Sequence, residues 1–286
     1  MPELPEVEVI RAGLAQAIAG SHVASLEVRD PRAVKRHRAG AADFERCVIG
    51  ARFLEPLRRG KFMWIPLDGD VLDGSTALLA HLGMSGQLLL RTPEQPDDRH
   101  VRVRMWIESP GHGELRLDFA DQRLFGSLAV DSLVAGVPSQ VAHIARDPLD
   151  PEFRDDLFLL ALRKRSAAIK KVLLDQKVIS GVGNIYADEA LWLARIHAET
   201  PASAVSTVKA RRLLDAVRSV FEKALAEGGT SFDRLYVNVN GESGPFYIHV
   251  KRVEASRTRK DPAWQCRTVA RRQRVVSRSD QARHAQ

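Results

Sequence analysis

The sequence predicts an α+β protein: an N-terminal antiparallel β-sandwich, flanked by an N-terminal helix, precedes a mostly helical domain. Three observations lead to this fold class. Apolar residues recur at helical spacing over residues 3–18, and short apolar segments separated by turn residues fill residues 22–131. After Pro151 the helical pattern dominates. Many short strands at close spacing are typical of an antiparallel sandwich.

The first helix carries Val7, Ile10, Leu14 and Ile18 on one face and ends at Gly20. Strands are expected at 23–28, 47–54, 61–67, 76–82, 86–91, 100–107, 114–119 and 125–130. Helices are expected at 153–162, 166–175, 186–195 and 205–227, with a short turn near 231–236. The expected divisions are a catalytic sandwich domain at 1–133, a linker at 134–151, a helical domain at 152–244 and a basic tail at 245–286.

Composition restricts the compartment and the partner. The chain has 286 residues, no apolar run long enough to span a membrane, and no signal peptide. Two cysteines, Cys47 and Cys266, fit a reducing cytoplasm. The net charge of +7 suggests a polyanionic partner, but residues 251–286 carry a net +8 and the remainder is almost neutral. A nucleic-acid surface in the body must therefore come from local clustering.

The chain begins Met1-Pro-Glu-Leu-Pro-Glu6. Removal of Met1 would leave Pro2 as a secondary amine with a pKa of about 8, so part of it is unprotonated at neutral pH. Such an amine can form a Schiff base with a sugar aldehyde carbon. Glu3 and Glu6 lie close enough in sequence to exchange protons there. On these residues alone, the start of a helix is the simpler interpretation, because proline and acidic residues suit a first turn.

Four internal segments combine glycine with polar or basic residues. Arg58-Arg-Gly-Lys61 lies between two strands, where a solvated hairpin is the simpler interpretation. His81-Leu-Gly-Met-Ser-Gly86 and Asp121-Gln-Arg-Leu-Phe-Gly126 lie at turns and could present side chains outward. Residues 170–190 read as a helix, a Gly-Val-Gly double turn and a second helix. Glycine-rich turns that open helices point backbone N–H groups at phosphates.

Together these segments resemble the formamidopyrimidine-DNA glycosylase (MutM) family, which is related to the endonuclease VIII-like glycosylases. The resemblance runs from residue 1 to about residue 244. It implies a bifunctional DNA glycosylase and abasic-site lyase that excises oxidised purines, such as 8-oxoguanine and formamidopyrimidines, during base excision repair. In that reading Pro2 forms the Schiff base, Glu3 shuttles protons through β,δ-elimination, Lys61 binds phosphate, and Glu6 supports the site.

The resemblance also implies how the DNA is held. The partner would be double-stranded DNA containing damaged bases, and the protein would act as a monomer in the cytoplasm, at the nucleoid of a bacterium. A wedge of Met84, Arg123 and Phe125 would fill the space left by an extruded base. The implied DNA-binding residues are His100, Arg123, Lys170, Asn184 and Tyr186. The alternatives from the residues alone are a buried methionine, an exposed surface Arg-x-Phe and a histidine at a strand edge.

The resemblance fails after Gly244. The family ends in a zinc finger with four cysteines, whereas this segment has only Cys266, so we expect no zinc and no other cofactor. The tail is rich in arginine. Three interpretations stay open: a zinc-free finger, a disordered basic arm, or a tail made non-native by a shifted reading frame.

Two other functions also stay open. One is an endonuclease VIII-like glycosylase for oxidised pyrimidines, which the cleavage of 8-oxoguanine and thymine-glycol duplexes would distinguish. The other is a catalytically impaired protein that binds damaged DNA, which the departure of the tail from the family pattern motivates.

Overall fold

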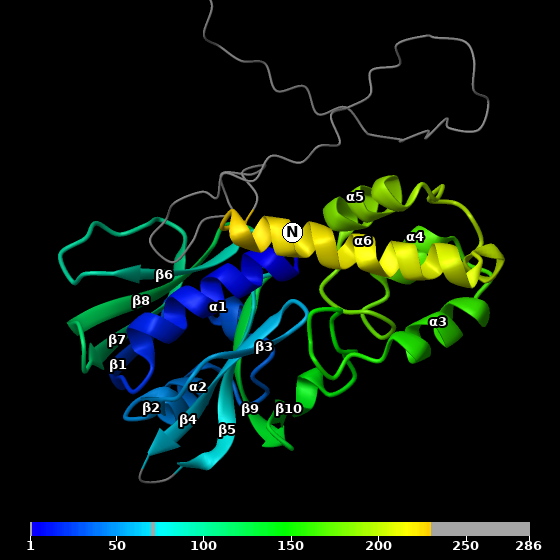
Figure 1. The fold of residues 1–286 in the computed structure, drawn as a ribbon. Helices are drawn as coiled ribbons and strands as arrows, with labels where there is room; N and C mark the ends of the chain where they lie inside the picture. The colour runs from blue at the N-terminus through cyan, green and yellow to red at the C-terminus, as the bar shows by residue number, and fades with distance from the viewer. Residues whose placement is uncertain (1, 70–71, 230–286) are drawn as a thin grey trace, which may run out of the picture. The chain divides into compact units, whose positions relative to one another are not determined.

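The structure is a computed structural model that describes residues 2–69 and 72–229 (Figure 1). Its first element is helix α1 (Leu4–Ile18), whose N-cap is Glu3. The Glu3 carboxylate accepts a hydrogen bond outside this helix, while the Glu3 backbone N–H donates to the Glu6 carboxylate over 2.8 Å. The expected helix at 3–18 is therefore confirmed, with its start one residue later.

Ten antiparallel strands lie within the described residues. They are β1 (His22–Val28), β2 (Arg52–Phe53), β3 (Leu57–Arg59), β4 (Phe62–Gly69), β5 (Leu72–His81), β6 (Gly86–Arg91), β7 (Val101–Ser109), β8 (Gly113–Asp121), β9 (Ser127–Val134) and β10 (Val137–Pro138). Their order is β10-β9-β5-β4-β2-β1-β7-β8-β6, with β3 paired to β4. Strands β2 and β1 pair through only one residue pair, His22 with Arg52. The strands from β10 to β2 form one layer, and those from β1 to β6 form the other.

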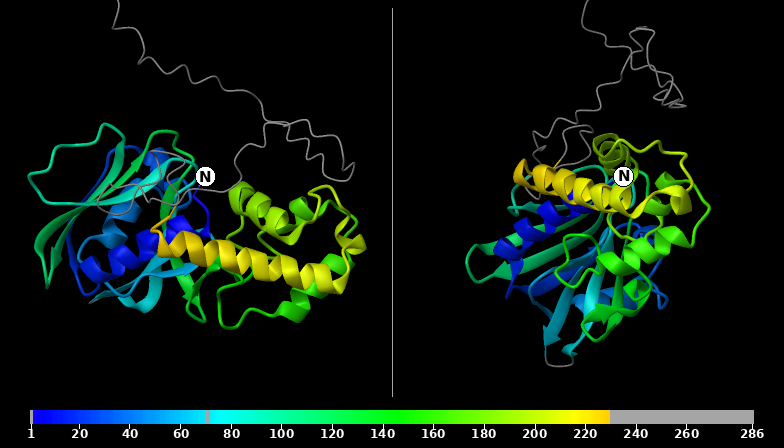
Figure 2. Two further views of the ribbon diagram at one scale, coloured as in Figure 1. Left: turned by 45° about the horizontal axis from the view of Figure 1, so that its top comes forward. Right: turned by 45° about the vertical axis from the view of Figure 1, so that its right-hand side comes forward.

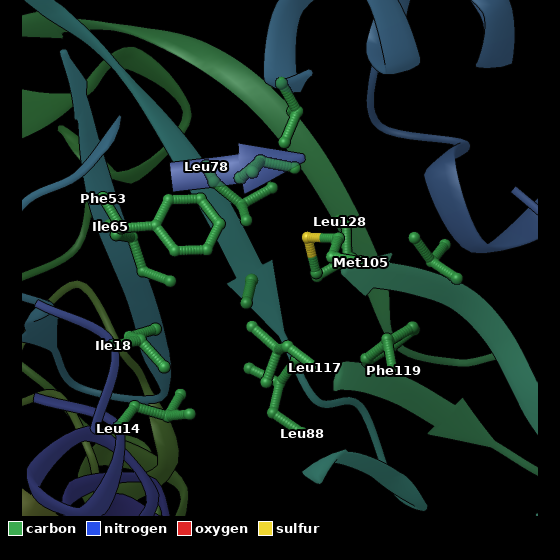
Figure 3. Close-up of a cluster of buried hydrophobic side chains, with 14 of the residues drawn as sticks. Leu14, Ile18, Phe53, Ile65, Leu78, Leu88, Met105, Leu117, Phe119 and Leu128 are labelled. Carbon is green, nitrogen blue, oxygen red and sulfur yellow. The ribbon is translucent and has the colours of Figure 1, made fainter. Parts of the chain in front are cut away.

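The two layers enclose one hydrophobic core. Leu78 of β5 and Leu128 of β9 come from one layer, and Leu117 of β8 comes from the other (Figure 3). Leu14 and Ile18 of α1 close one side of this core, beside Phe53 and Ile65 in the same view. Burial of these side chains away from water is the main stabilising contribution. The expected β-sandwich with a flanking helix is confirmed.

One expected strand is wrong. The sequence predicts a strand at 47–54, but α2 (Ala41–Val48) covers the start of this segment and only Arg52–Phe53 pair as a strand. Phe44 and Val48 are buried four residues apart, the spacing of a helix face, whereas Ile49 is exposed. Gly50 has a φ of 81° and turns the chain after the helix.

Short elements were also missed. No sequence pattern indicated β3 or the one-turn helix η1 (Pro31–Val34). In the expected linker, the two-residue strand β10 precedes a second such turn, η2 (Ser139–Val141). Elements of two to four residues are too short to show a hydrophobic period, so sequence patterns miss them.

The second half is helical. It contains α3 (Asp155–Arg163), α4 (Ile169–Leu174), α5 (Asn184–Ala194), the turn η3 (Ala202–Ala204) and α6 (Thr207–Ala226), close to the four expected helices. These helices share a second core, which also includes Leu4 of α1. Helix α6 contacts α1, and its C-terminal end lies next to α1 (Figures 1 and 2).

Two of the expected segments cannot be compared with the structure. The turn near 231–236 and the basic tail lie outside the described residues. None of the helices in the described ranges is long and apolar enough to cross a membrane.

Candidate active site

The Glu3 carboxylate joins α1 to the start of α5. Its two oxygens accept hydrogen bonds from the backbone N–H groups of Gly183 (2.7 Å) and Ile185 (2.9 Å), with a longer bond from Tyr186 (3.3 Å). Gly183 is the N-cap of α5 and offers no side chain, so a residue 180 positions earlier caps this helix. The positive end of the helix dipole favours a carboxylate here.

Burial controls the protonation of Glu3. Its side chain is 2% exposed, and this burial raises the pKa from an ordinary value of 4.5 to about 7. The positive charge of Lys61 and the N–H groups of α5 oppose that rise, whereas the charge of Glu6 adds to it. A carboxyl with a pKa of about 7 can both donate and accept a proton at neutral pH.

Glu6 supports the same site from one turn along α1. One carboxylate oxygen accepts the Glu3 backbone N–H, and the other accepts the Tyr186 hydroxyl over 2.7 Å. Tyr186 is 0% exposed, and its ring packs edge-on against Phe221 with centroids 5.3 Å apart. The buried hydroxyl therefore holds Glu6, and a contact of Tyr186 with DNA stays a prediction.

Lys61 approaches these carboxylates from the β3–β4 turn. Its side chain is buried, which lowers the pKa of the ammonium group, while Glu3 and Glu6 act in the opposite direction. Gly60 has a φ of 57°, and a Cβ there would lie 2.7 Å from the Cβ of Ser180. Only glycine lets this turn pack so closely against the turn before α5. The structure therefore brings Glu3, Glu6 and Lys61 together, as the sequence predicted.

Pro2 is buried beside Glu3, at the tip of α1. The next backbone N–H, that of Leu4, donates to the Gly181 carbonyl over 3.0 Å. This bond fixes the path of the N-terminus against the double turn. In a chain that retains Met1 the Pro2 nitrogen is an amide, so the nucleophile exists only after Met1 has been removed.

The Arg58 side chain is mostly buried, although a solvated hairpin is the simpler interpretation of its sequence segment. Its guanidinium donates to Glu8 of α1 (2.9 Å) and to Asp147 (2.9 Å), which follows η2. Both acids raise the pKa of Arg58, against the effect of its burial. Arg58 therefore ties α1 to the segment that leads into the helical half.

The proposed wedge residues come from two neighbouring loops. Met84, between β5 and β6, is 36% exposed, and Phe125, between β8 and β9, is 51% exposed. The guanidinium of Arg123 lies over the Phe125 ring, 4.8 Å from its centroid. His100 lies next to them, since its carbonyl accepts the Asp121 backbone N–H over 2.9 Å. The structure thus places these residues on one part of the surface.

The phosphate-binding residues expected in the helical half lie at α4 and α5. Asn184 is exposed at the first residue of α5. The Lys170 ammonium pairs with Asp188, one turn further along α5, at 2.7 Å. The N–H groups of Gly183, Ile185 and Tyr186 already donate to Glu3, so a phosphate would meet the exposed Asn184 there, whereas Lys170 would have to share its charge with Asp188.

The sequence patterns did not single out several residues that build the site. Gln176 brackets the double turn: its amide donates to the Val182 carbonyl and its oxygen accepts the Gly181 N–H. His81 lies near Lys61, and burial, with the charges of Arg36 and Lys61, lowers its pKa to about 4. One signal was available in the sequence. Gly183 at the N-cap of α5 has no side chain, so the N–H groups of this helix start require an acceptor from elsewhere in the chain.

No group of three or more metal-ligating side chains occurs among residues 2–69 and 72–229. Cys47 lies on α2 with its thiol near Asp43, and Cys266 lies outside the described residues. Two cysteines cannot form the four-cysteine zinc site of the family, so the residues do not fit that metal.

Comparison with known proteins agrees with this geometry. Residues 1–128 match the model of the formamidopyrimidine-DNA glycosylase N-terminal domain, and residues 144–234 match that of its H2TH domain. A formamidopyrimidine-DNA glycosylase of Leifsonia xyli subsp. xyli is 54% identical over 260 residues, covering 86% of each chain. One of Salinispora arenicola is 51% identical over 280 residues, covering 98% of this chain and 93% of its own. The latter alignment extends beyond residue 244.

Solved structures give the same result. The Lactococcus lactis Fpg in complex with DNA containing an abasic site is 30% identical, with a TM-score of 0.71, over 85% of this chain and 84% of its own. A MutM complex with DNA containing carbocyclic 8-oxo-G is 31% identical, with a TM-score of 0.72, over the same shares.

Proposed function

Because this chain belongs to the formamidopyrimidine-DNA glycosylase family, we propose that it excises oxidised purines from duplex DNA and cuts the strand at the resulting abasic site. The observation that carries the proposal is the Glu3 carboxyl, buried between Lys61 and the start of α5 beside the N-terminal proline. The names of the curated relatives favour oxidised purines over oxidised pyrimidines.

The first step uses Pro2 as a nucleophile. Its nitrogen lone pair forms a bond to C1′ of the damaged nucleotide, and the base leaves with the electrons of the glycosidic bond and gains a proton. The proline nitrogen then loses its own proton. Its lone pair forms the C1′ iminium as the C1′–O4′ bond breaks, and O4′ takes a proton. A protonated Glu3 is suited to supply that proton, since its pKa is about 7.

Two eliminations then cut the strand. Loss of a proton from C2′ breaks the C3′–O bond, and loss of a proton from C4′ breaks the C5′–O bond, each releasing a phosphate. Hydrolysis of the iminium returns the free proline. Lys61 would orient a phosphate near Glu3, and Asn184 would bind one at the exposed start of α5.

The proposal also covers the cofactor, the oligomeric state and the DNA-contacting residues. These steps are substitutions, eliminations and proton transfers, so we propose no cofactor. We expect a monomer that acts on damaged duplex DNA in the cytoplasm. Met84, Arg123 and Phe125 would occupy the space of the extruded base, and His100 would contact the backbone beside them.

Borohydride trapping tests the nucleophile. The mature protein should form a covalent adduct with DNA containing 8-oxoguanine, and the adduct should map to Pro2. A form that retains Met1, and Pro2→Gly, should give none. Pro5→Ala is the control, because it changes the other proline of the same turn without touching the amine. An adduct mapped to Lys61, or stronger cutting of thymine glycol than of 8-oxoguanine, would contradict the proposal.

A further inference from the structure

The wedge residues share no strand or helix. Met84 lies in the turn that joins β5 to β6, whereas Arg123 and Phe125 lie in the loop that joins β8 to β9. All three side chains are exposed, so packing in the core does not fix them. A wedge that enters a base stack must keep its parts in register, and this requires a connection between the two loops.

Asp121 supplies that connection. Its side chain, at the end of β8, is 1% exposed. One carboxylate oxygen accepts the Ser85 hydroxyl and the Arg123 backbone N–H (3.1 Å), and the other accepts the Gly126 backbone N–H (2.8 Å). A buried carboxylate with three donors is a strong local anchor. The donors come from both loops.

Ser85 completes the link from the other side. It is 3% exposed and follows Met84 directly. Its oxygen also accepts the Arg123 backbone N–H at 3.1 Å, so that N–H is shared between Ser85 and Asp121. The residues next to both parts of the wedge therefore meet in one buried hydrogen-bond network.

The loop backbones are also in close contact. Gly83 has a φ of 62°, and a Cβ there would lie 2.5 Å from the carbonyl carbon of Phe125. Leu124 has a φ of 54°, which L side chains rarely adopt, and its carbonyl accepts the Lys35 ammonium over 2.6 Å. The Asp121 bonds on either side of Leu124 hold the loop in this unfavourable conformation.

We propose that Asp121 and Ser85 are positioning residues that couple the two loops into one rigid wedge for base extrusion. This inference rests on the proposed function and deepens it. Both side chains are buried, so they act through Met84, Arg123 and Phe125 and not through contact with DNA. The Asp121 backbone N–H extends the unit to the carbonyl of His100.

Asp121→Asn and Ser85→Ala test the coupling. An amide at position 121 places an NH2 group against at least one of the backbone N–H groups that now donate to the carboxylate. The chain offers a control pair of the same residue types at a more exposed position: Asp131 accepts the Ser139 hydroxyl over 2.7 Å and the Gln140 N–H over 2.8 Å, away from both loops. The control variants are Asp131→Asn and Ser139→Ala.

Three measurements separate extrusion from chemistry. The first is single-turnover excision of 8-oxoguanine from a duplex, which requires the wedge. The second is incision at an abasic site in a single strand, where no base stack is entered. The third is the fluorescence of 2-aminopurine next to a tetrahydrofuran site in a duplex, which reports unstacking without any bond cleavage.

We expect Asp121→Asn to slow duplex excision by about 10- to 100-fold, the effect of a lost charge-assisted hydrogen bond. Single-strand incision should change less than twofold, and the 2-aminopurine signal should fall. Ser85→Ala should act in the same direction, and the double variant should lose less than the product of the single losses. The control variants should match the unchanged protein in all three measurements.

Other results would overturn the inference. An equal loss on duplex and single strand, or an unchanged 2-aminopurine signal, would mean that Asp121 does not position a wedge. If Asp121→Asn unfolds, Ser85→Ala decides, because it removes one hydroxyl only. Failure of the unchanged protein to cut any oxidised purine would refute the proposed function instead. The tetrahydrofuran duplex would then still test the coupling, since it needs no chemistry.

Discussion

Replacing Glu3 with glutamine should change how the stability of this protein depends on pH. Burial raises the pKa of Glu3 from 4.5 to about 7 in the folded chain, whereas the unfolded chain has no such burial. The folded state therefore binds this proton more tightly than the unfolded state. Its contribution to the free energy of unfolding is complete below pH 4.5 and is lost as the pH rises to 7. Glutamine does not titrate, so Glu3→Gln removes this loss.

The magnitude follows from the two pKa values. A pKa difference of two to three units, at about 1.4 kcal/mol per unit, corresponds to roughly 3 kcal/mol in total. Between pH 5 and pH 8 most of the wild-type contribution is lost, roughly 2 to 3 kcal/mol. The stability of Glu3→Gln relative to wild type should therefore rise by that amount over this interval and stay level above it. Lys61→Met removes the charge that lowers the Glu3 pKa, so it should move the transition to higher pH.

Urea unfolding at pH 5, 6, 7 and 8 measures this difference. Glu8→Gln is the control on the same helix, because its hydrogen bonds to Arg11 and Arg58 lower the Glu8 pKa despite its burial. That variant should be less stable than wild type by a constant amount over the same interval, since both folded and unfolded Glu8 are then mostly ionised. If the stability of Glu3→Gln relative to wild type did not change with pH, the Glu3 pKa would not be raised. If it fell with rising pH, the charge of Lys61 and the N–H groups of α5 would outweigh burial and lower the Glu3 pKa.

Three further predictions concern the site and the tail. Gly183→Ala should lower both the unfolding temperature and the single-turnover excision rate, because its Cβ would overlap the Glu3 carboxylate; Gly111→Ala, which has open space around it, should change neither, and equal effects would contradict this. Met84→Ala and Phe125→Ala should slow cutting of a paired lesion more than cutting of a preformed abasic site, and equal losses would argue against a wedge. Removal of residues 251–286, with 11 basic and 3 acidic residues, should flatten the salt dependence of DNA binding, whose log–log slope is about −0.9 per neutralised phosphate; an unchanged slope would exclude the tail from phosphate binding.

The sequence predicted the long elements and missed the short ones. Helix α6 is 20 residues long and repeats its apolar face from Ala210 to Ala224, and strands β4 and β7 have eight and nine residues. In contrast, α2 has eight residues, and its two buried side chains precede an exposed isoleucine that extends the apolar run. The local pattern at residues 47–54 therefore favoured a strand, whereas packing of Phe44 and Val48 against the sandwich core stabilises a helix.

The site was predictable where chemistry depends on residue type. A free proline amine, a nearby acid and a lysine could be named from the first residues and the Arg-Gly-Lys turn, through the family resemblance. The role of Tyr186 was not predictable, because its partner Glu6 lies 180 residues earlier. An aromatic residue after a phosphate-binding turn suggests contact with DNA, and only the tertiary structure shows that the hydroxyl points inward.

The same long-range contacts make the active site a property of both halves of the chain. Leu4 belongs to the core of the helical half, whereas Val7, one turn later, belongs to the core of the sandwich. Glu3 precedes both and depends on backbone donors of α5 to compensate its buried charge. A sandwich domain without the helical half would expose Leu4 and leave Glu3 solvated, and its pKa would return toward that of a free glutamate. The raised pKa that suits Glu3 for proton transfer therefore exists only when the two cores are both formed and share α1.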